Sequence, residues 1–185
     1  LGVLLASDVP LDDALEALAH VTAPPGRMER QGGGAEPLVV VDYAHSPDAL
    51  AHVLAALRPA VREGGRLICV FGCGGDRDRG KRAPMGAVAG RLADRVIVTN
   101  DNPRDEDPQA IAGEIVAGLS PVSSEFRVEL DRARAIEQAI ADARAGDVVV
   151  VAGKGHEDYQ EANGVRVPFS DAGCVSRVLA RRRGE

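Results

Sequence analysis

Residues 38–72 read LVVVDYAHSPDALAHVLAALRPAVREGGRLICVFG, and this stretch decides the fold. An apolar run of strand-forming residues at 38–44 is followed by a helical pattern at 46–61 and by a second apolar run at 66–72. Pro47 stands at the first turn of that helix, where a missing backbone N–H is tolerated. Because strands that are apolar throughout are buried on both faces, the stretch predicts a strand–helix–strand unit of a parallel sheet.

The same alternation continues toward the C-terminus. Further helices are expected at 83–93, 107–119, 131–144 and 171–183, and further strands at 95–100, 127–130, 147–153 and, as an edge strand, 165–170. Residues 27–185 are therefore predicted to form an α/β domain, Rossmann-like and doubly wound, with a mostly parallel sheet and helices on both faces.

The N-terminal part has a different pattern. Residues 8–21 carry apolar side chains at helical spacing behind an Asp-x-Pro start, which predicts an amphipathic helix. Residues 22–37 are rich in Pro and Gly and are predicted to be a linker, with Gly32 to Gly34 as a hairpin tip or a flexible loop. Since the chain begins with Leu1, it is expected to be a fragment of something longer.

Composition narrows the classes of function. Lys and Arg total 22 against 28 Asp and Glu, and the resulting net charge of −6 argues against nucleic acid as a partner. No apolar run approaches the roughly 20 residues that span a bilayer, and no signal peptide is recognisable. The three cysteines form no C-x-x-C pair, so reduced thiols in a cytoplasmic protein are expected.

Polar clusters follow four of the expected strands. They are DYAHSP (42–47), GCGGDRDRGKR (72–82), TNDNPRDED (99–107) and GKGHEDY (153–159). In doubly wound folds ligands bind outside the carboxyl ends of the strands, so the four clusters predict a single site.

The second cluster mimics a phosphate-binding P-loop. Gly75, Gly80 and Lys81 satisfy G-x-x-x-x-G-K, but Arg82 replaces the hydroxyl residue that would hold Mg²⁺. Carboxylates at Asp76 and at position 78 also stand where a phosphate needs bare N–H groups. The P-loop interpretation is therefore rejected, and a solvated loop of alternating charge remains as the alternative.

The third cluster is a polar turn with one unexpected cation. The acidic residues at 105–107 would begin the next helix well, whereas Arg104 lies near the unfavourable end of that helix dipole. An anion, and a carboxylate in particular, would explain the guanidinium.

The first and last clusters carry groups that suit other parts of a ligand. Glycines around residue 154 would let a ligand approach the backbone, and Glu157 could bind an ammonium group. Asp42 suits a ribose, while Tyr43 and His45 suit the base or phosphates of a nucleotide. Each of these features also has a plain structural explanation as a turn or a buried histidine.

Taken together, the clusters resemble the C-terminal domain of the Mur ligases. The matching stretches are PGRME (25–29), VVVDYAHSPDAL (39–50), FGCGGDRDRGKR (71–82), DNPR (101–104) and GKGHE (153–157). Within the family, the pattern is most similar to the members that add diaminopimelate.

The resemblance implies ATP-dependent amide formation in cytoplasmic peptidoglycan synthesis. ATP and Mg²⁺ would phosphorylate the D-glutamate carboxylate of a UDP-linked muramoyl dipeptide, and an amine of diaminopimelate would attack the acyl phosphate. An N-terminal domain would bind the UDP-sugar, and a central domain would carry the P-loop, the Mg²⁺ ligands and a carbamylated lysine. Residues 1–24 would be the tail of that central domain, and residues 25–185 would deliver the amino acid and close over ATP. By itself this fragment, without catalytic residues or metal ligands, is expected to be inactive.

The resemblance also assigns residues. The implied diaminopimelate contacts are Arg77, Asp101, Asn102, Pro103, Arg104, Gly153 and Glu157. The implied ATP contacts are Arg27, Asp42, Tyr43 and His45. Arg104 would bind the distal carboxylate, which lysine lacks. Lys154, His156 and Asp171 receive no assigned role.

Two alternatives stay open. One is a ligase of the same family that adds L-lysine. A neutral residue in place of Arg104 would have favoured this alternative. The other is a non-catalytic α/β ligand-binding or receiver-like module, in which Asp101 and Lys154 would mimic a phosphorylated aspartate and its lysine.

Overall fold

The computed structural model describes residues 2–20, 24–119 and 125–184. Its strands are β1 (Glu29–Gly32), β2 (Leu38–Asp42), β3 (Leu67–Phe71), β4 (Arg95–Val98), β5 (Glu125–Val128), β6 (Val148–Ala152), β7 (Tyr159–Ala162) and β8 (Val165–Pro168). Its helices are α1 (Gly2–Ala6), α2 (Leu11–Ala19), α3 (Pro47–Leu57), α4 (Arg82–Leu92), α5 (Pro108–Leu119), α6 (Arg132–Asp142) and α7 (Asp171–Arg183), with 3-10 turns η1 (Arg58–Ala60) and η2 (Arg79–Lys81).

The main sheet has the order β1-β2-β6-β3-β4-β5. The strands β2 to β6 run parallel, and β1 is antiparallel to β2. This confirms the predicted mostly parallel sheet. The order also argues against the receiver-like alternative, because a flavodoxin-like receiver has the order 2-1-3-4-5 with its last strand at an edge. Here the last strand of the main sheet, β6, lies between β2 and β3.

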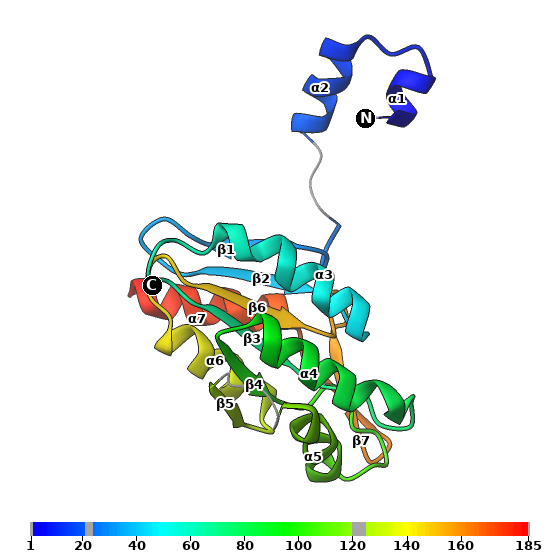
Figure 1. Cartoon of the computed structure of the whole chain (residues 1–185), viewed down its shortest axis with the longest axis vertical. Helices are drawn as coiled ribbons and strands as arrows, with labels where there is room; N and C mark the ends of the chain where they lie inside the picture. The colour runs from blue at the N-terminus through cyan, green and yellow to red at the C-terminus, as the bar shows by residue number, and fades with distance from the viewer. Residues whose placement is uncertain (1, 21–23, 120–124, 185) are drawn as a thin grey trace.

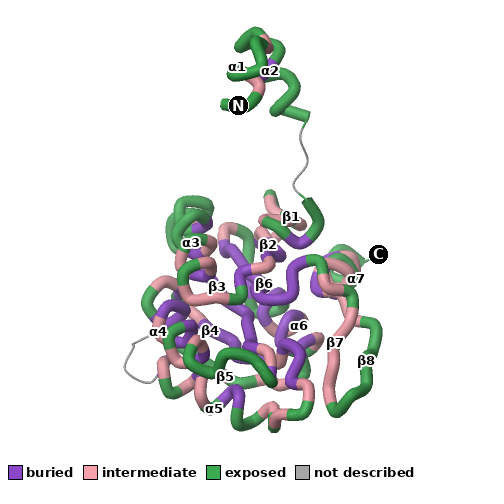
Figure 2. Tube along the Cα trace, turned by 90° about the vertical axis from the view of Figure 1, so that its right-hand side faces the viewer, coloured by how far each residue is buried: buried purple, intermediate pink, exposed green. Residues whose placement is uncertain are grey.

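Helices cover both faces of the sheet, as predicted (Figure 1). The side chains of Val148 and Val150 pack into the core with α3, α4 and α5, and those of Val149 and Val151 pack with α6 and α7. This alternation follows from the period of two along a strand. Strands β2, β3, β4 and β6 are buried along the middle of the molecule, whereas β5, β8 and the outer helix faces are largely exposed (Figure 2).

Capping residues set the starts of the helices that follow the strands. The Ser46 hydroxyl accepts a hydrogen bond from the Ala49 N–H, and Pro47 occupies the first turn of α3, as predicted. Asp131 and Ser170 cap α6 and α7 in the same way.

The predicted linker at 22–37 contains a strand. Residues 29–32 form β1, which pairs with β2 through a turn at Gly32 to Gly34, so the predicted hairpin tip is confirmed and the linker prediction is wrong for β1. Polar alternation in ERQG hid this half-exposed edge strand. Residues 22 and 23 lie outside the described residues.

Residues 165–168 form a strand, but they do not extend the main sheet. Strand β8 pairs with β7 in a separate antiparallel hairpin, which corrects the predicted edge strand. Asn163 and Gly164 form the two-residue turn, with φ values of 50° and 70°. Asn-Gly is the sequence that such a turn favours, because both positions need positive φ.

The N-terminal helices stand apart from the sheet in Figure 1. The predicted helix at 8–21 begins later, at Leu11, because Pro10 takes the cap position, and α1 was not predicted. Ala14 of α2 is buried, but Leu15 and Leu18 on the same apolar face are 49% and 38% exposed, so the described residues cover this face only in part. No described helix has the length and apolar character to cross a membrane.

Candidate functional site

The four polar clusters meet at the carboxyl ends of β2, β3, β4 and β6, as predicted. They surround a polar cavity of about 410 Å³. Its lining residues are Tyr43, His45, Gly74, Arg77, Asp78, Lys81, Asp101, Asn102, Arg104, Gly153, Glu157 and Tyr159. The cavity thus collects all the implied diaminopimelate contacts except Pro103, which lines a separate, more apolar hollow of about 560 Å³.

Asn102 is a buried junction between the third and fourth clusters. Its amide nitrogen donates to Glu157 Oε2 at 2.8 Å. Its amide oxygen accepts from Lys154 Nζ and from the Glu161 backbone N–H, each at 3.0 Å. These bonds fix both the position and the orientation of the amide, so the loop that follows β4 is tied to the loop that follows β6.

The hairpin β7–β8 holds Arg104 in a left-handed conformation, with φ 52°. The Arg104 N–H donates to Glu161 O at 3.1 Å, and Arg104 O accepts from Asn163 N at 2.7 Å. A non-glycine residue rarely adopts this φ, so the hairpin contacts stabilise a strained position. Strain of this kind is common where a side chain must be aimed at a ligand.

Only part of the Arg104 guanidinium is hydrogen-bonded within the described chain. Nη1 donates to Gly75 O at 2.7 Å, and Nε lies 3.9 Å from a carboxylate oxygen of Glu161. Nε and Nη2 make no hydrogen bond with any residue that the structure describes, and the side chain is 21% exposed. The edge of the guanidinium formed by Nε and Nη2 is therefore available to a carboxylate.

Asp101 and Gly153 meet beneath the cavity. Burial raises the pKa of Asp101 above its ordinary value, while Arg132 and the nearby Lys154 act to lower it. Gly153 has φ +116°, and a Cβ there would lie 2.8 Å from Asp101 Oδ2, so a side chain is excluded at this position.

A buried arginine joins the second cluster to the third. Arg82 is fully buried and donates to both carboxylate oxygens of Glu106, at 3.1 and 2.9 Å, to Glu114 at 3.0 Å and to Gly74 O at 3.2 Å. The bond from Arg82 holds the pKa of Glu106 at about 2. The prediction that the acidic run 105–107 serves to start a helix is therefore wrong for Glu106, although Asp107 does accept from the Gln109 N–H.

A second buried arginine supports the site from below. Arg132 and Asp171 are both fully buried, and they share two hydrogen bonds of 2.7 Å. Arg132 also donates to Asn100 O and to Ala152 O, each at 3.0 Å. Those carbonyls lie where the chain leaves β4 and β6, so this ion pair holds the first residues of the two loops that follow these strands. Asp171, left without a role by sequence, belongs to this support.

Tyr43 and His45 line another part of the cavity, and Arg27 and His156 lie beside the Tyr43 ring. The ring of Tyr43 lies 4.7 Å from that of His45 and 5.4 Å from that of His156, and the guanidinium of Arg27 lies 5.4 Å from the Tyr43 ring. Gly26 packs directly on the GKGHE loop, since a Cβ there would lie 2.0 Å from His156 N. Cations and flat rings of this kind fit phosphates and a base.

The Asp42 carboxylate is more buried and more fully hydrogen-bonded than expected for a residue that contacts a ribose. It is 8% exposed, and its two oxygens accept from Met28 N at 2.9 Å and Ala44 N at 2.8 Å. Asp42 thus holds the arginine-bearing segment against the end of β2, and its contact with a ribose stays a prediction.

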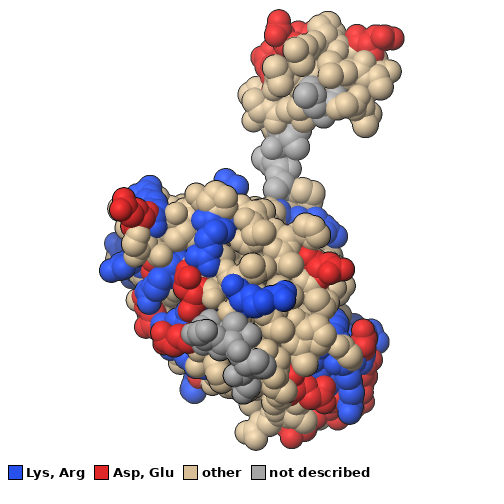
Figure 3. Space-filling view, in the orientation of Figure 1, with Lys and Arg blue, Asp and Glu red and all other residues tan. Residues whose placement is uncertain are grey.

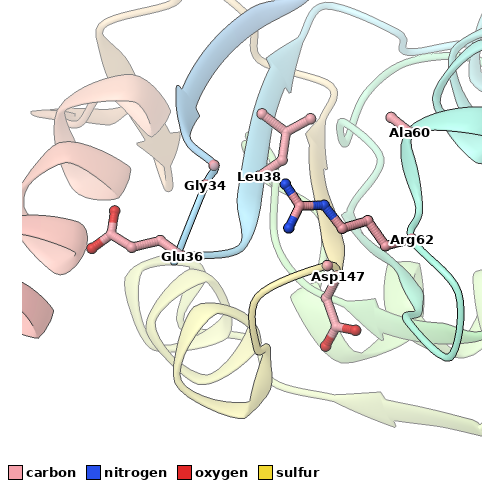
Figure 4. A pocket seen from close by; sticks show the side chains of 8 residues that line it. Gly34, Glu36, Leu38, Ala60, Arg62 and Asp147 are labelled. Atoms are coloured by element: carbon pink, nitrogen blue, oxygen red, sulfur yellow. The ribbon is translucent and has the colours of Figure 1, made fainter.

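A third, smaller hollow lies at the amino ends of the strands, opposite the polar cavity (Figure 4). It encloses about 150 Å³ near Leu38 and Asp147, at the amino ends of β2 and β6. Asp147 is committed to the Arg66 backbone and guanidinium and to the Arg144 N–H, at 2.8, 3.0 and 3.0 Å. The size of the hollow and these commitments argue against a ligand there.

Charge is distributed without a continuous basic band on the face in Figure 3, where basic side chains lie among acidic ones. Within the described ranges, no group of three or more His, Cys, Asp or Glu side chains could hold a metal ion.

Sequence reasoning missed the residues that hold the site together. Lys154, Arg132 and Asp171 are fully buried charges, and Tyr159 lines the cavity from the β7–β8 hairpin. A lysine between two glycines at a strand end was a visible signal, but the partners of a buried charge come from distant segments and cannot be read from spacing.

Comparison with known proteins places the chain in a family. Residues 26–155 match the family described as Mur ligase, glutamate ligase domain. A UDP-N-acetylmuramoyl-L-alanyl-D-glutamate–2,6-diaminopimelate ligase of Acidovorax sp. (strain JS42) is 59% identical over 188 positions, which cover 100% of this chain and 37% of that ligase.

Comparison with solved structures supports the same family. The structure of a UDP-N-acetylmuramoyl-L-alanyl-D-glutamate–2,6-diaminopimelate ligase is 42% identical with a TM-score of 0.81, over 98% of this chain and 37% of that chain. A bifunctional folylpolyglutamate synthase/dihydrofolate synthase from Yersinia pestis, complexed with AMPPNP and Mn ion, is 26% identical with a TM-score of 0.63 over the same shares. The chain spans 36–37% of the length of the curated relatives that it matches. With the family match over most of its length and these two structural likenesses, the chain belongs to the Mur ligase family.

Proposed function

We propose that this chain is the amino-acid-binding domain of an ATP-dependent ligase that adds 2,6-diaminopimelate to the D-glutamate of a UDP-N-acetylmuramoyl dipeptide in cytoplasmic peptidoglycan synthesis. The observation that carries the proposal is the single polar cavity that brings Arg77, Arg104, Asp101 and Glu157 together. A ligand with two ammonium groups and two carboxylates needs a site with both signs of charge, and this cavity supplies them.

The proposed contacts follow from the available atoms. The unbonded edge of the Arg104 guanidinium binds the distal carboxylate, and Arg77 is a second cation at the cavity wall. Glu157 and Asp101 bind ammonium groups, while Gly153 lets the ligand approach the backbone. Pro103 fixes the loop ahead of Arg104 without itself facing the cavity.

The choice between diaminopimelate and lysine depends on Arg104. Lysine would leave its guanidinium without an anion, and truncation of one partner of a desolvated charge pair costs on the order of 2–5 kcal/mol. The site is therefore proposed to discriminate strongly against lysine.

The Tyr43 and His45 rings are proposed to face the nucleotide. Arg27 would meet the phosphates, Tyr43 and His45 the base, and Asp42 the ribose, with the phosphoryl group supplied by ATP when it is bound. The Mg²⁺ ligands are proposed to belong to a preceding central domain, of which residues 1–24 are the tail, while residues 25–185 form the amino-acid domain. The exposed Leu face of α2 supports this division, because an apolar face of that kind normally packs against protein.

Calorimetric titration of the chain with meso-diaminopimelate tests the amino-acid site. L-Lysine is the control ligand, Arg104→Ala the test variant, and Arg181→Ala, a surface arginine of α7, the matched control. Diaminopimelate is expected to bind to the wild type and to Arg181→Ala, with lysine much weaker and binding lost in Arg104→Ala.

Equal binding of lysine would refute the role of Arg104. If neither ligand binds, the same variants are assayed in the full-length ligase with ATP and the UDP-dipeptide. A full-length protein that forms no amide product from diaminopimelate would refute the proposed function.

A further inference from the structure

We propose that Lys154 is a positioning residue of the amino-acid site, which orients Glu157 so that one of its carboxylate oxygens is left for an ammonium group of the ligand. The inference rests on the proposed function and adds a residue that touches no ligand. Lys154 is fully buried and has no role in the contacts proposed above.

Lys154, Asn102 and Glu157 form a closed triangle of polar contacts. Lys154 Nζ lies 3.0 Å from Asn102 Oδ1 and 3.1 Å from Glu157 Oε2, and Asn102 Nδ2 donates to the same Glu157 oxygen at 2.8 Å. Because the Asn102 oxygen also accepts from the Glu161 N–H, the amide cannot turn over without losing bonds. The triangle therefore has one stable arrangement.

This arrangement divides the two oxygens of Glu157. Oε2 receives both donors, whereas Oε1 receives no hydrogen bond from any residue in the described part of the chain. The Glu157 side chain is 24% exposed and lines the cavity. Oε1 is thus the oxygen that remains for a ligand ammonium group, and Lys154 fixes which oxygen that is.

Lys154 also separates two negative groups. Its Nζ lies 4.0 Å from Asp101 Oδ1, so the ammonium stands between the carboxylates of Asp101 and Glu157. Without this cation, the two carboxylates would repel each other, and a buried carboxylate without a partner is unfavourable. The centroid of the Tyr159 ring lies 5.5 Å from Nζ, within the range of a cation–π contact.

The test uses the full-length ligase, with amide formation followed at varied diaminopimelate and at varied ATP. Lys154→Met keeps the length and burial of the side chain and removes its charge. The diaminopimelate KM is expected to rise about 10- to 100-fold, the scale on which small misplacements in a site act. The ATP KM is expected to change less than about threefold, since the Lys154 ammonium is bonded to Asn102 and Glu157 and not to a residue proposed to face the nucleotide. Arg181→Met is the control for the loss of a cation.

A double-mutant cycle separates positioning from a merely structural role. If Lys154 acts through Glu157, Lys154→Met should change the diaminopimelate KM far less in a Glu157→Gln background than in the wild type. Equal factors in the two backgrounds, or an unchanged KM in Lys154→Met, would overturn the inference. Should Lys154→Met not fold, Lys154→Gln takes its place with the same expected rise and the same overturning results.

The two proposals fail in different ways. A wild-type enzyme that forms no product with diaminopimelate overturns the proposed function and this inference together. An active wild type with an unaffected Lys154 variant overturns the inference alone.

Discussion

The buried Arg132–Asp171 pair gives a sharp prediction about stability. Asp171→Leu removes the carboxylate and leaves the guanidinium fully buried with two carbonyl partners and no counter-charge. Removal of one member of a buried pair typically costs about 3–5 kcal/mol. A typical domain has about 5–15 kcal/mol of stability, so the loss is a large share of the total. For a chain of this length it corresponds to a fall in Tm of about 6–20 °C.

Urea unfolding and thermal unfolding of the chain measure this cost. The control is Glu137→Gln, which breaks an exposed pair with Arg181 at 2.6 Å, and exposed pairs contribute about 0–1 kcal/mol. The double variant Arg132→Met/Asp171→Leu removes both charges and is expected to recover more than half of the loss. If Asp171→Leu costs no more than the control, or the double variant is no better than the single one, the pair does not support the loops as described.

Three further predictions concern charge, backbone and thiols. The pKa of Glu106 is about 2 in the folded protein, against 4.5 for an unperturbed glutamate. The ionised carboxylate therefore stabilises the fold fully above pH 4.5, and this contribution is lost as the pH falls toward 2. The difference in urea midpoint between the wild type and Glu106→Gln should shrink over that pH range. Gly155→Ala should lower the Tm and the affinity for the nucleotide, since φ is +53° and a Cβ would lie 2.7 Å from Gly26 O, and an unchanged Tm would contradict this contact. Burial raises the pKa of Cys69 and of Cys73 to about 12, so a thiol reagent at pH 8 should label neither in the folded chain and both in urea.

The sheet was predictable because its signal is local. The apolar runs at 38–44, 66–72 and 147–153 each form a buried strand, and Ser46 and Asp131 mark helix starts by capping chemistry that a few adjacent residues express. Strand β1 escaped prediction because an edge strand with one solvent-facing side needs few apolar residues.

The location of the site was predictable from the sequence, whereas its hydrogen bonds and ion pairs were not. Strand ends meet at one edge of a parallel sheet, so the convergence of the four clusters followed from the fold class. The left-handed backbone of Arg104 depends on a hairpin nearly 60 residues further along the chain, and the partners of Arg82 and Lys154 are set by packing. Interactions between distant segments leave no periodic trace in a sequence.

The place of β6 in the sheet also bears on how the protein is made. Strand β6 fills the gap between β2 and β3, although it is the last strand of the sheet to be synthesised. Until residue 152 has left the ribosome, β2 with β1 and β3 with β4 and β5 cannot join, and each half presents the unpaired edge of a largely apolar strand. Such edges template intermolecular pairing. A nascent or truncated chain that ends before β6 should therefore need a chaperone to stay in solution, whereas a chain that extends past it completes both the core and the site in one step.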